Sequence, residues 1–245
     1  MKKIDLADLI PMDVFVGREP IKIDLVYAQA DHPYNFFKEA IYQKNSRLWT
    51  HKDLATIILL TARKLHQNYK YTLELKDCMR TVEAQTTMQE TDIVKDNPQW
   101  MELPNPLLST PGARSHPRAM AIDVCVYDSN HKEVDMGTHF DFMGKEAHRD
   151  YKDFSDNILN NRKTLENAFM QSAENLGFPF LALSTEWWDF RFPAAYSEEF
   201  GPLRDADLPP QMQMTHQINN NIPDFSQEHF DKLAEEIINT VNENI

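Results

Sequence analysis

The sequence predicts an α+β fold: a mainly antiparallel central sheet flanked by helices, in a single domain that carries a helical extension at its C-terminus. Segments with strand-like alternation and segments with helical periodicity follow one another in no strict order. No internal repeat or low-complexity linker interrupts the first part of the chain. We therefore expect one domain over residues 1–208, followed by a polar linker and an amphipathic helix over residues 209–245.

Two long helices are expected in the domain. Residues 52–65 carry apolar side chains at helical spacing, with Thr50 and Asp53 as the expected capping residues. Residues 156–176 form the second helix, with Ser155 as N-cap and Gly177 in the left-handed position that often follows a helix. Both helices should turn their apolar side toward the core.

Strands are expected on either side of a shorter helix. Residues 71–75 alternate as a strand does, residues 81–89 favour a helix, and residues 119–127 (AMAIDVCVY) alternate cleanly. In this last stretch β-branched side chains occupy one face, whereas Asp123 and Cys125 share the other. The β-branched face is expected in the core.

Residues 227–242 predict a final amphipathic helix. Its apolar stripe consists of Phe230, Leu233, Ile237, Ile238 and Val241. Such a stripe must be covered, either by the core of the same chain or by a second copy in a homodimer.

The charge of the chain excludes some partners. Its 38 acidic and 25 basic residues give a net charge of −13, which repels phosphate backbones and anionic lipids. No stretch approaches the roughly 18 apolar residues that cross a bilayer, and the start of the chain lacks the apolar segment of a signal peptide. We expect neither nucleic acid nor a membrane as a partner, and a cytoplasmic location for the chain as given. Removal of a signal peptide would instead indicate the periplasm.

Two cysteines, Cys78 and Cys125, are too few for a disulfide framework or a cysteine-only zinc site. Buried free thiols are the favoured interpretation, and one bridge between the two is the alternative.

Asp123 is the first candidate for chemistry. A carboxylate within a β-branched strand is costly to bury unless it meets a cation, a metal or several donors. His116 lies seven residues earlier, before a turn at Pro117, so the two side chains can converge at a strand end. By itself this pair is weak evidence for a metal, because Arg or backbone donors also hold buried aspartates.

The segment EWWDF, residues 186–190, adds two carboxylates. Glu186 and Asp189 are three residues apart, a spacing that sends side chains to opposite faces of a regular strand. A turn or bulge is therefore needed to bring them together. Without it, Asp189 aligns with Arg191 and pairs with it.

Five segments in the same chain order resemble the zinc D-alanyl-D-alanine dipeptidases that accompany vancomycin resistance. SHPRAMAID and EWWDF match the family signatures SxHxxGxAxD and ExWH. The further similar segments are LVYAQADHPYNFF near Leu25, KDCMRTVEAQ around Arg80 and DMGTHFDFM from Asp135. Together they cover about residues 24–192.

The resemblance implies a mononuclear zinc enzyme that hydrolyses D-alanyl-D-alanine or a related short cell-wall peptide. It implies that His116 and Asp123 are metal ligands and that Glu186 activates a metal-bound water. Arg80 would stabilise the oxyanion, although without the family a surface ion pair is the simpler interpretation of this residue. Asp141 would lie near the free amino group of the substrate.

The chain departs from the signatures at the third metal ligand, where Asp189 replaces the histidine of ExWH. A site with two carboxylates and one imidazole favours harder metals such as Mn²⁺ more than a two-histidine site does. His139 and His148 are the candidates for a replacement imidazole. The favoured interpretation of both is that they are exposed loop residues.

The substrate pocket also differs from the signatures. Arg114 takes the place of a serine that belongs to this pocket in the family, and Ser115 is displaced by one position. Ala119 replaces a glycine, and Cys78-Met79 replaces Gly-Tyr before the arginine. An arginine in the pocket can bind a terminal carboxylate with two hydrogen bonds, and the alternative is that it simply fills the pocket.

Two alternative functions remain open on the sequence. One is a D,D- or L,D-carboxypeptidase that trims longer peptidoglycan peptides. The other is a metal-free relative that binds a peptide or protein, in which Asp189 pairs with Arg191.

Overall fold

The computed structural model describes residues 1–102 and 108–245. In chain order the strands are β1 (Leu9–Pro11), β2 (Ile21–Ile23), β3 (Trp49–His51), β4 (Thr72–Asp77), β5 (Ala121–Tyr127), β6 (Leu181–Ala182) and β7 (Asp189–Arg191). The α-helices are α1 (Lys52–Tyr69), α2 (Val82–Glu90), α3 (Asp92–Lys95), α4 (Asp156–Asn175), α5 (Ala194–Ser197) and α6 (Gln227–Glu243).

A five-stranded sheet with the order β2-β4-β5-β7-β6 forms the centre of the fold. The β2-β4 pair is parallel, and the other three pairs are antiparallel. A separate two-stranded sheet joins β1 to β3. The mixed fold with a mainly antiparallel sheet confirms the predicted class.

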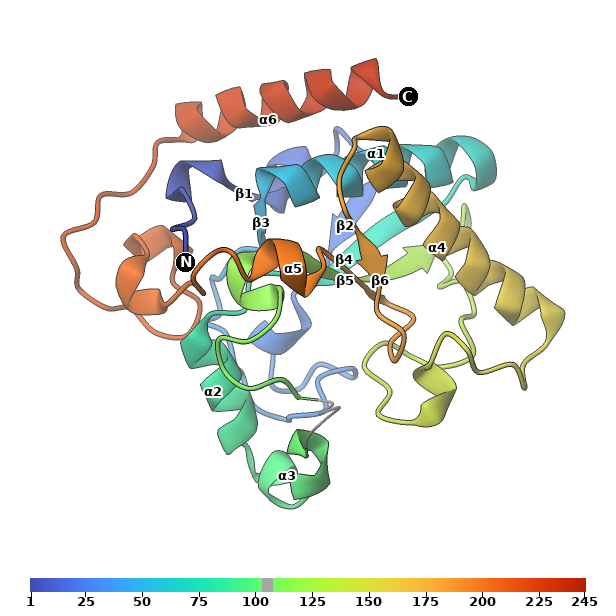
Figure 1. Cartoon of the computed structure of the whole chain (residues 1–245), viewed down its shortest axis with the longest axis horizontal. Helices are drawn as coiled ribbons and strands as arrows, with labels where there is room; N and C mark the ends of the chain where they lie inside the picture. Colours follow the sequence, from blue (N-terminus) through green and yellow to red (C-terminus); the bar gives the residue numbers. More distant parts are fainter. Residues whose placement is uncertain (103–107) are drawn as a thin grey trace.

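The long helices cover one face of the sheet (Figure 1). On that face the β-branched side chains of β5 are buried together with Leu73 and Leu75 of β4. Phe169 of α4 stacks on Phe190 of β7 with ring centroids 4.0 Å apart. Because side chains alternate along a strand, Asp123, Asp189 and Arg191 point to the opposite face.

The predicted caps are right at one helix and wrong at the other. The hydroxyl of Ser155 accepts a hydrogen bond from the backbone of Ile158 at the start of α4, and Gly177 has a φ of +73° after its end. At α1 the N-cap is His51, whose ring accepts from the backbone N–H of Asp53. Thr50 lies in β3 instead. An imidazole in a strand residue is an uncommon cap, so the sequence pattern favoured the neighbouring threonine.

Strand β5 begins two residues later than the alternation predicts. The preceding turn, His116–Arg118, ends at Ala119, which has a φ of 55° and a ψ of 32°. A left-handed alanine is disfavoured by its Cβ, whereas glycine is not. This conformation gives a physical reason for the glycine at the same position of the family signature.

The C-terminal helix α6 packs on α1 of the same chain. The ring of Phe230 lies 5.5 Å from that of Trp49, and both side chains are buried. The apolar stripe of α6 therefore contacts the chain's own core. In the segment before α6, Gln213 is also buried, and it donates a hydrogen bond to the carbonyl of Leu208.

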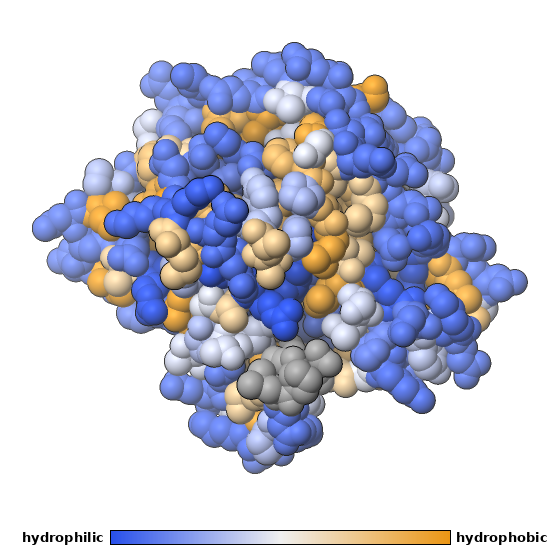
Figure 2. All heavy atoms as spheres, in the orientation of Figure 1, coloured by the Kyte–Doolittle hydropathy of each residue, from blue (hydrophilic) through white to orange (hydrophobic). Residues whose placement is uncertain are grey.

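Cys78 and Cys125 are buried free thiols, as the sequence favoured. Figure 2 shows hydrophilic residues over most of one face of the molecule and apolar residues in its middle. Among the described residues, no helix has the length and apolar character needed to cross a membrane.

Truncation of Phe230 should destabilise the fold. Phe230→Ala removes a buried ring against Trp49, and such a change costs about 3–5 kcal/mol of unfolding free energy. Asn239→Ala, at an exposed position of the same helix, should stay within about 0.5 kcal/mol of the unchanged protein. Chemical denaturation measures both. A loss of unfolding free energy in Phe230→Ala as small as that in Asn239→Ala would show that α6 does not stabilise the domain.

Candidate active site

Three aspartates lie opposite one another on three neighbouring strands. The register pairs Asp77 of β4 with Asp123 of β5, and Asp123 with Asp189 of β7. A shift of register between Leu75 and Asp77 brings the end of β4 into this row. All three side chains are buried, so the sheet concentrates negative charge at one point of its open face.

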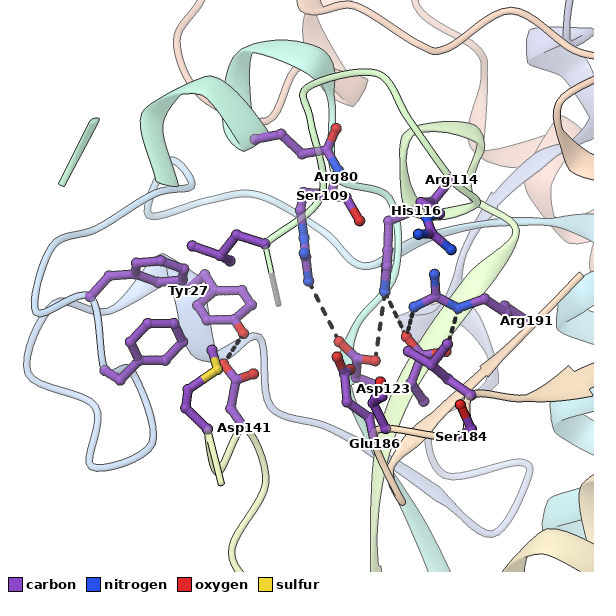
Figure 3. A pocket seen from close by; sticks show the side chains of 18 residues that line it. Tyr27, Arg80, Ser109, Arg114, His116, Asp123, Asp141, Ser184, Glu186 and Arg191 are labelled. Carbon is purple, nitrogen blue, oxygen red and sulfur yellow. Dashed lines mark hydrogen bonds and ion pairs between the residues drawn. The ribbon is translucent and has the colours of Figure 1, made fainter. Parts of the chain in front are cut away.

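Arg80 binds two of these aspartates, and Figure 3 shows its contact with one of them, Asp123. Its Nε and Nη2 atoms donate to Oδ2 of Asp77 at 2.9 and 2.6 Å, and Nη2 lies 3.5 Å from Oδ2 of Asp123. The hydroxyl of Tyr42 donates to the other oxygen of Asp77 at 2.6 Å. The interpretation of Arg80 as a surface ion pair is therefore wrong, because its guanidinium is held inside the pocket.

His116 lies in the turn before β5, and its ring points toward the row of three aspartates. Its Nδ1 lies 2.7 Å from the carbonyl oxygen of Cys78 and donates to it. Its Nε2 faces Oδ1 of Asp123 at 3.6 Å and Oδ2 of Asp189 at 3.3 Å. A histidine whose one nitrogen is tied to a carbonyl presents the other nitrogen as a ligand.

Asp189 pairs with Arg191, as the regular strand alternation predicted. The Nε of Arg191 donates to Oδ1 of Asp189 at 2.6 Å, and its Nη2 donates to Oδ2. Both side chains are buried and lie on the same face of β7. Asp189 thus contacts a guanidinium on one side and His116 on the other.

Glu186 precedes β7 in a turn that supplies the predicted distortion. Arg149 holds both ends of this turn: its Nε donates to the carbonyl of Leu183 at 2.8 Å, and its Nη2 donates to the carbonyl of Asp189 at 2.9 Å. The guanidinium also lies over the ring of Phe190. The backbone of the turn that carries Glu186 is therefore held by a partly buried arginine.

A pocket of about 180 Å³ is lined by Arg80, His116, Asp123, Glu186, Asp189 and Arg191. Its wall includes Tyr27 and Asp141, whose side chains are joined by a hydrogen bond that the tyrosine donates. Arg114 also lines it and is exposed. The volume is below the roughly 300–1,000 Å³ of pockets for drug-sized ligands, so the space suits a small molecule.

Three candidates from the sequence lie outside the pocket. Ser115 is buried, and its hydroxyl donates to the carbonyl of Phe192, so the structure does not support the expected substrate contact. His139 stacks on Tyr34, and His148 follows a short helical turn. Neither histidine is among the residues that line the pocket.

The acidic groups shift one another's pKa values. Burial raises the pKa of Glu186 to about 8, with a further contribution from Asp189. Burial likewise raises the pKa of Asp123 to about 6 and that of Asp141 to about 7. At Asp189 burial acts in the same direction, but Arg191 and His116 outweigh it and hold the pKa of this carboxyl group well below its usual range.

His116 responds to the same charges. Burial and Arg80 lower its pKa, but Asp123 and Asp189 outweigh them and raise the pKa to about 9. In the protein without a metal, a proton on Nε2 therefore supplies part of the positive charge that the carboxylates require.

The donor set at His116 fits a divalent cation. Oδ1 of Asp123 is buried and has no hydrogen-bond partner, although it faces Nε2 of His116. Carboxylate oxygens of Asp123, Glu186 and Asp189 approach one another within 4.8 Å. Such an unpaired buried oxygen costs free energy unless a cation binds it.

Asp77 also lies close to His116 and Asp123. It is a weaker candidate as a ligand, because Arg80 and Tyr42 already occupy its two oxygens. Its nearest approach to His116 is to Nδ1, at 3.9 Å, on the side of the ring that bonds Cys78. The Nε2 side of the ring is therefore the candidate position for a cation.

The sequence analysis missed Asp77 and Tyr27. Asp77 stands three residues before Arg80 and so carried a signal, an acid and a base at close spacing. Tyr27 lies in the segment LVYAQADHPYNFF that resembles the family, but its contact with Asp141 spans 114 positions of the chain, so no local spacing indicates it.

The comparisons agree with the motifs. A family model described as D-ala-D-ala dipeptidase matches residues 7–205. The D-alanyl-D-alanine dipeptidase of Escherichia coli (strain K12) is 30% identical over 196 residues, which cover 79% of this chain and 86% of that protein. A D-alanyl-D-alanine dipeptidase of Enterococcus faecium is 39% identical over 77 residues, 31% of this chain and 35% of that protein.

The acidic pocket should make the metal-free protein less stable as the pH rises. Raised carboxyl pKa values stabilise the fold fully below the unfolded values of 3.8 and 4.5, and this contribution is lost as the pH rises through about 6, 7 and 8. His116 acts in the same direction, between 6.5 and about 9. The melting temperature in the presence of a chelator should therefore fall from about pH 6 to about pH 8.

Glu186→Gln should reduce this fall, whereas Glu228→Gln, at an exposed position on α6, should not. Thermal melts at a series of pH values measure the difference. A melting temperature that is constant or rises over this interval would contradict the assignment of raised pKa values.

Proposed function

The chain belongs to the D-Ala-D-Ala dipeptidase family, and from this membership we propose that it hydrolyses D-alanyl-D-alanine or a closely related short peptide with the help of a divalent metal ion. One observation carries the proposal: Oδ1 of Asp123, which is buried without a hydrogen-bond partner, and Nε2 of His116 face each other at 3.6 Å beside the carboxyl group of Glu186. A buried oxygen without a partner is a feature that a bound cation explains.

His116, Asp123 and Asp189 are the proposed metal ligands. A divalent ion held there would polarise the scissile carbonyl and acidify water, as zinc does in other hydrolases. Zinc is the metal of the family that the motifs resemble. The two carboxylates in this set also suit Mn²⁺, so we propose that the site accepts either ion.

Glu186 is the proposed general base. Its carboxyl group lines the pocket beside the proposed ligands, where it can reach a water bound to the metal. It would take a proton from the attacking water and deliver it to the amine that leaves. Cleavage of the peptide bond then needs no further acid.

Arg80 is the proposed electrophilic group. Its guanidinium is fixed by Asp77 and reaches toward Asp123 at the pocket wall. A cation held in place before the reaction stabilises the negative charge that develops on the carbonyl oxygen, without the cost of reorganisation.

The two ends of the substrate have charged partners in the pocket. Asp141 would bind the free amino group of the substrate. The hydroxyl of Tyr27 donates a hydrogen bond to the Asp141 carboxyl group and so orients it. Arg114 would bind the terminal carboxylate. The small volume of the pocket favours a dipeptide over the longer wall peptides that a carboxypeptidase trims.

Release of D-alanine from the dipeptide tests the proposal. The protein loaded with Zn²⁺ or Mn²⁺ should hydrolyse D-alanyl-D-alanine faster than a peptidoglycan pentapeptide. Glu186→Gln should lower kcat by about 100-fold or more, because it removes the proton acceptor and keeps the shape. Glu228→Gln on α6 is the matched control and should leave kcat unchanged. Absence of hydrolysis with either metal would refute the proposed activity, and preference for the pentapeptide would favour a carboxypeptidase.

Arg114→Met tests the carboxylate contact. If the guanidinium binds the substrate equally in the ground state and the transition state, its loss raises KM about 10-fold or more with little change in kcat. Arg204→Met, at an exposed site outside the pocket, should change neither constant. An unchanged KM for Arg114→Met would remove this residue from the substrate site.

A further inference from the structure

Arg191 stands against the residue that replaces the third histidine of the family signature. Asp189 occupies that position, and the only side-chain hydrogen bonds that Arg191 donates among the described residues go to its two oxygens. We infer that Asp189 and Arg191 act as one electrically neutral unit at the cation site, with Arg191 cancelling the negative charge that Asp189 adds in place of a neutral imidazole. The inference rests on the proposed function only in requiring that a divalent cation binds.

The geometry leaves Asp189 able to bind a cation while it is paired. Each carboxylate oxygen has two lone-pair positions, and a fork of two N–H donors uses one on each oxygen. The Oδ2 atom accepts from Arg191 and also lies 3.3 Å from Nε2 of His116. Its second lone pair faces Nε2 of His116 within hydrogen-bonding distance, and a cation that displaces the proton from this nitrogen can take that position.

Arg191 does not itself take the place of the cation. A guanidinium that had replaced the cation would donate to Oδ1 of Asp123, yet this buried oxygen has no partner. Arg80 reaches the other oxygen of Asp123, at 3.5 Å. Two arginines thus border the site and leave its central oxygen unpaired.

The backbone fixes the pair before any ligand arrives. Asp189 and Arg191 lie on the same face of β7, and the register sets them opposite Asp123 and Ala121 of β5. Arg149 binds the carbonyl oxygen of Asp189 from the other side. A pair that is already ordered loses little entropy when the cation binds.

The formal charge around the cation therefore depends on residues 189 and 191 together. His116, Asp123, Asp189 and Arg191 sum to one negative charge, the same as the set of two histidines and one aspartate in the family signature. Asp189→His with Arg191 unchanged would bring the sum to zero. Asp189→His combined with Arg191→Met would return it to one negative charge.

A double-mutant cycle on zinc binding tests the inference. The probe is Zn²⁺ alone, titrated into the full chain in competition with a chromophoric chelator, so no peptide hydrolysis is needed. Asp189→His should bind Zn²⁺ at least about 10-fold more weakly than the unchanged protein, because it leaves the positive charge of Arg191 uncompensated beside the cation. Adding Arg191→Met to Asp189→His should recover most of this loss. Arg204→Met is the matched control and should leave the affinity unchanged.

Two results would overturn the inference. If Asp189→His binds Zn²⁺ as tightly as the unchanged protein or more tightly, Arg191 does not balance the charge of residue 189. If the double variant binds no better than Asp189→His alone, the charge of Arg191 is not felt at the site. Should the Asp189→His variants fail to fold, Asp189→Asn with and without Arg191→Met gives the same comparison with a neutral amide.

The cycle separates this inference from the proposed function. Zinc affinities in the expected order together with no hydrolysis of D-alanyl-D-alanine would support the charge pairing and refute the dipeptidase. Hydrolysis of D-alanyl-D-alanine together with an unchanged zinc affinity in Asp189→His would support the dipeptidase and refute the charge pairing.

Discussion

The site depends on one constraint, the burial of three aspartates in a single row across β4, β5 and β7. Carboxylates so close together cannot all remain ionised without positive charge nearby. Arg80 meets the first, Arg191 meets the last, and the oxygen of Asp123 that faces His116 has no partner. A cation at this central position would balance the negative charge, and two of its proposed ligands, His116 and Asp123, match the family signature.

The rest of the fold keeps this row in place. Helices cover the opposite face of the sheet, where Phe169 stacks on Phe190 and anchors the strand that carries Asp189 (Figure 1). Turns at the ends of the strands deliver the remaining groups: the turn before β5 presents His116, and the turn before β7 presents Glu186. Arg149 fixes the second turn through two carbonyl oxygens, so rigid elements set the geometry on both sides of the pocket.

Local sequence patterns predicted much of this arrangement. The rest depends on how the strands pair, which the sequence does not show directly. The alternation in β5 placed Asp123 on the face away from the core, and the spacing of Asp189 and Arg191 predicted their pairing. Asp77 enters the row only through a shift of register in β4, which no local pattern shows. Ser115 lies outside the residues that line the pocket, because its hydroxyl donates to the carbonyl of Phe192 in the interior. Tyr27 meets Asp141 through a contact between distant segments, which periodicity cannot predict.

The central claim is that the row of aspartates binds one divalent cation at His116 and Asp123. Elemental analysis of the full chain, purified without any chelator, tests it most directly. The account predicts about one equivalent of zinc or manganese per chain, lost when His116 is replaced by alanine and retained when the exposed His131 is replaced. Protein that is folded and contains no bound transition metal, even after incubation with zinc and manganese, would contradict the account and favour a peptide-binding relative without catalysis.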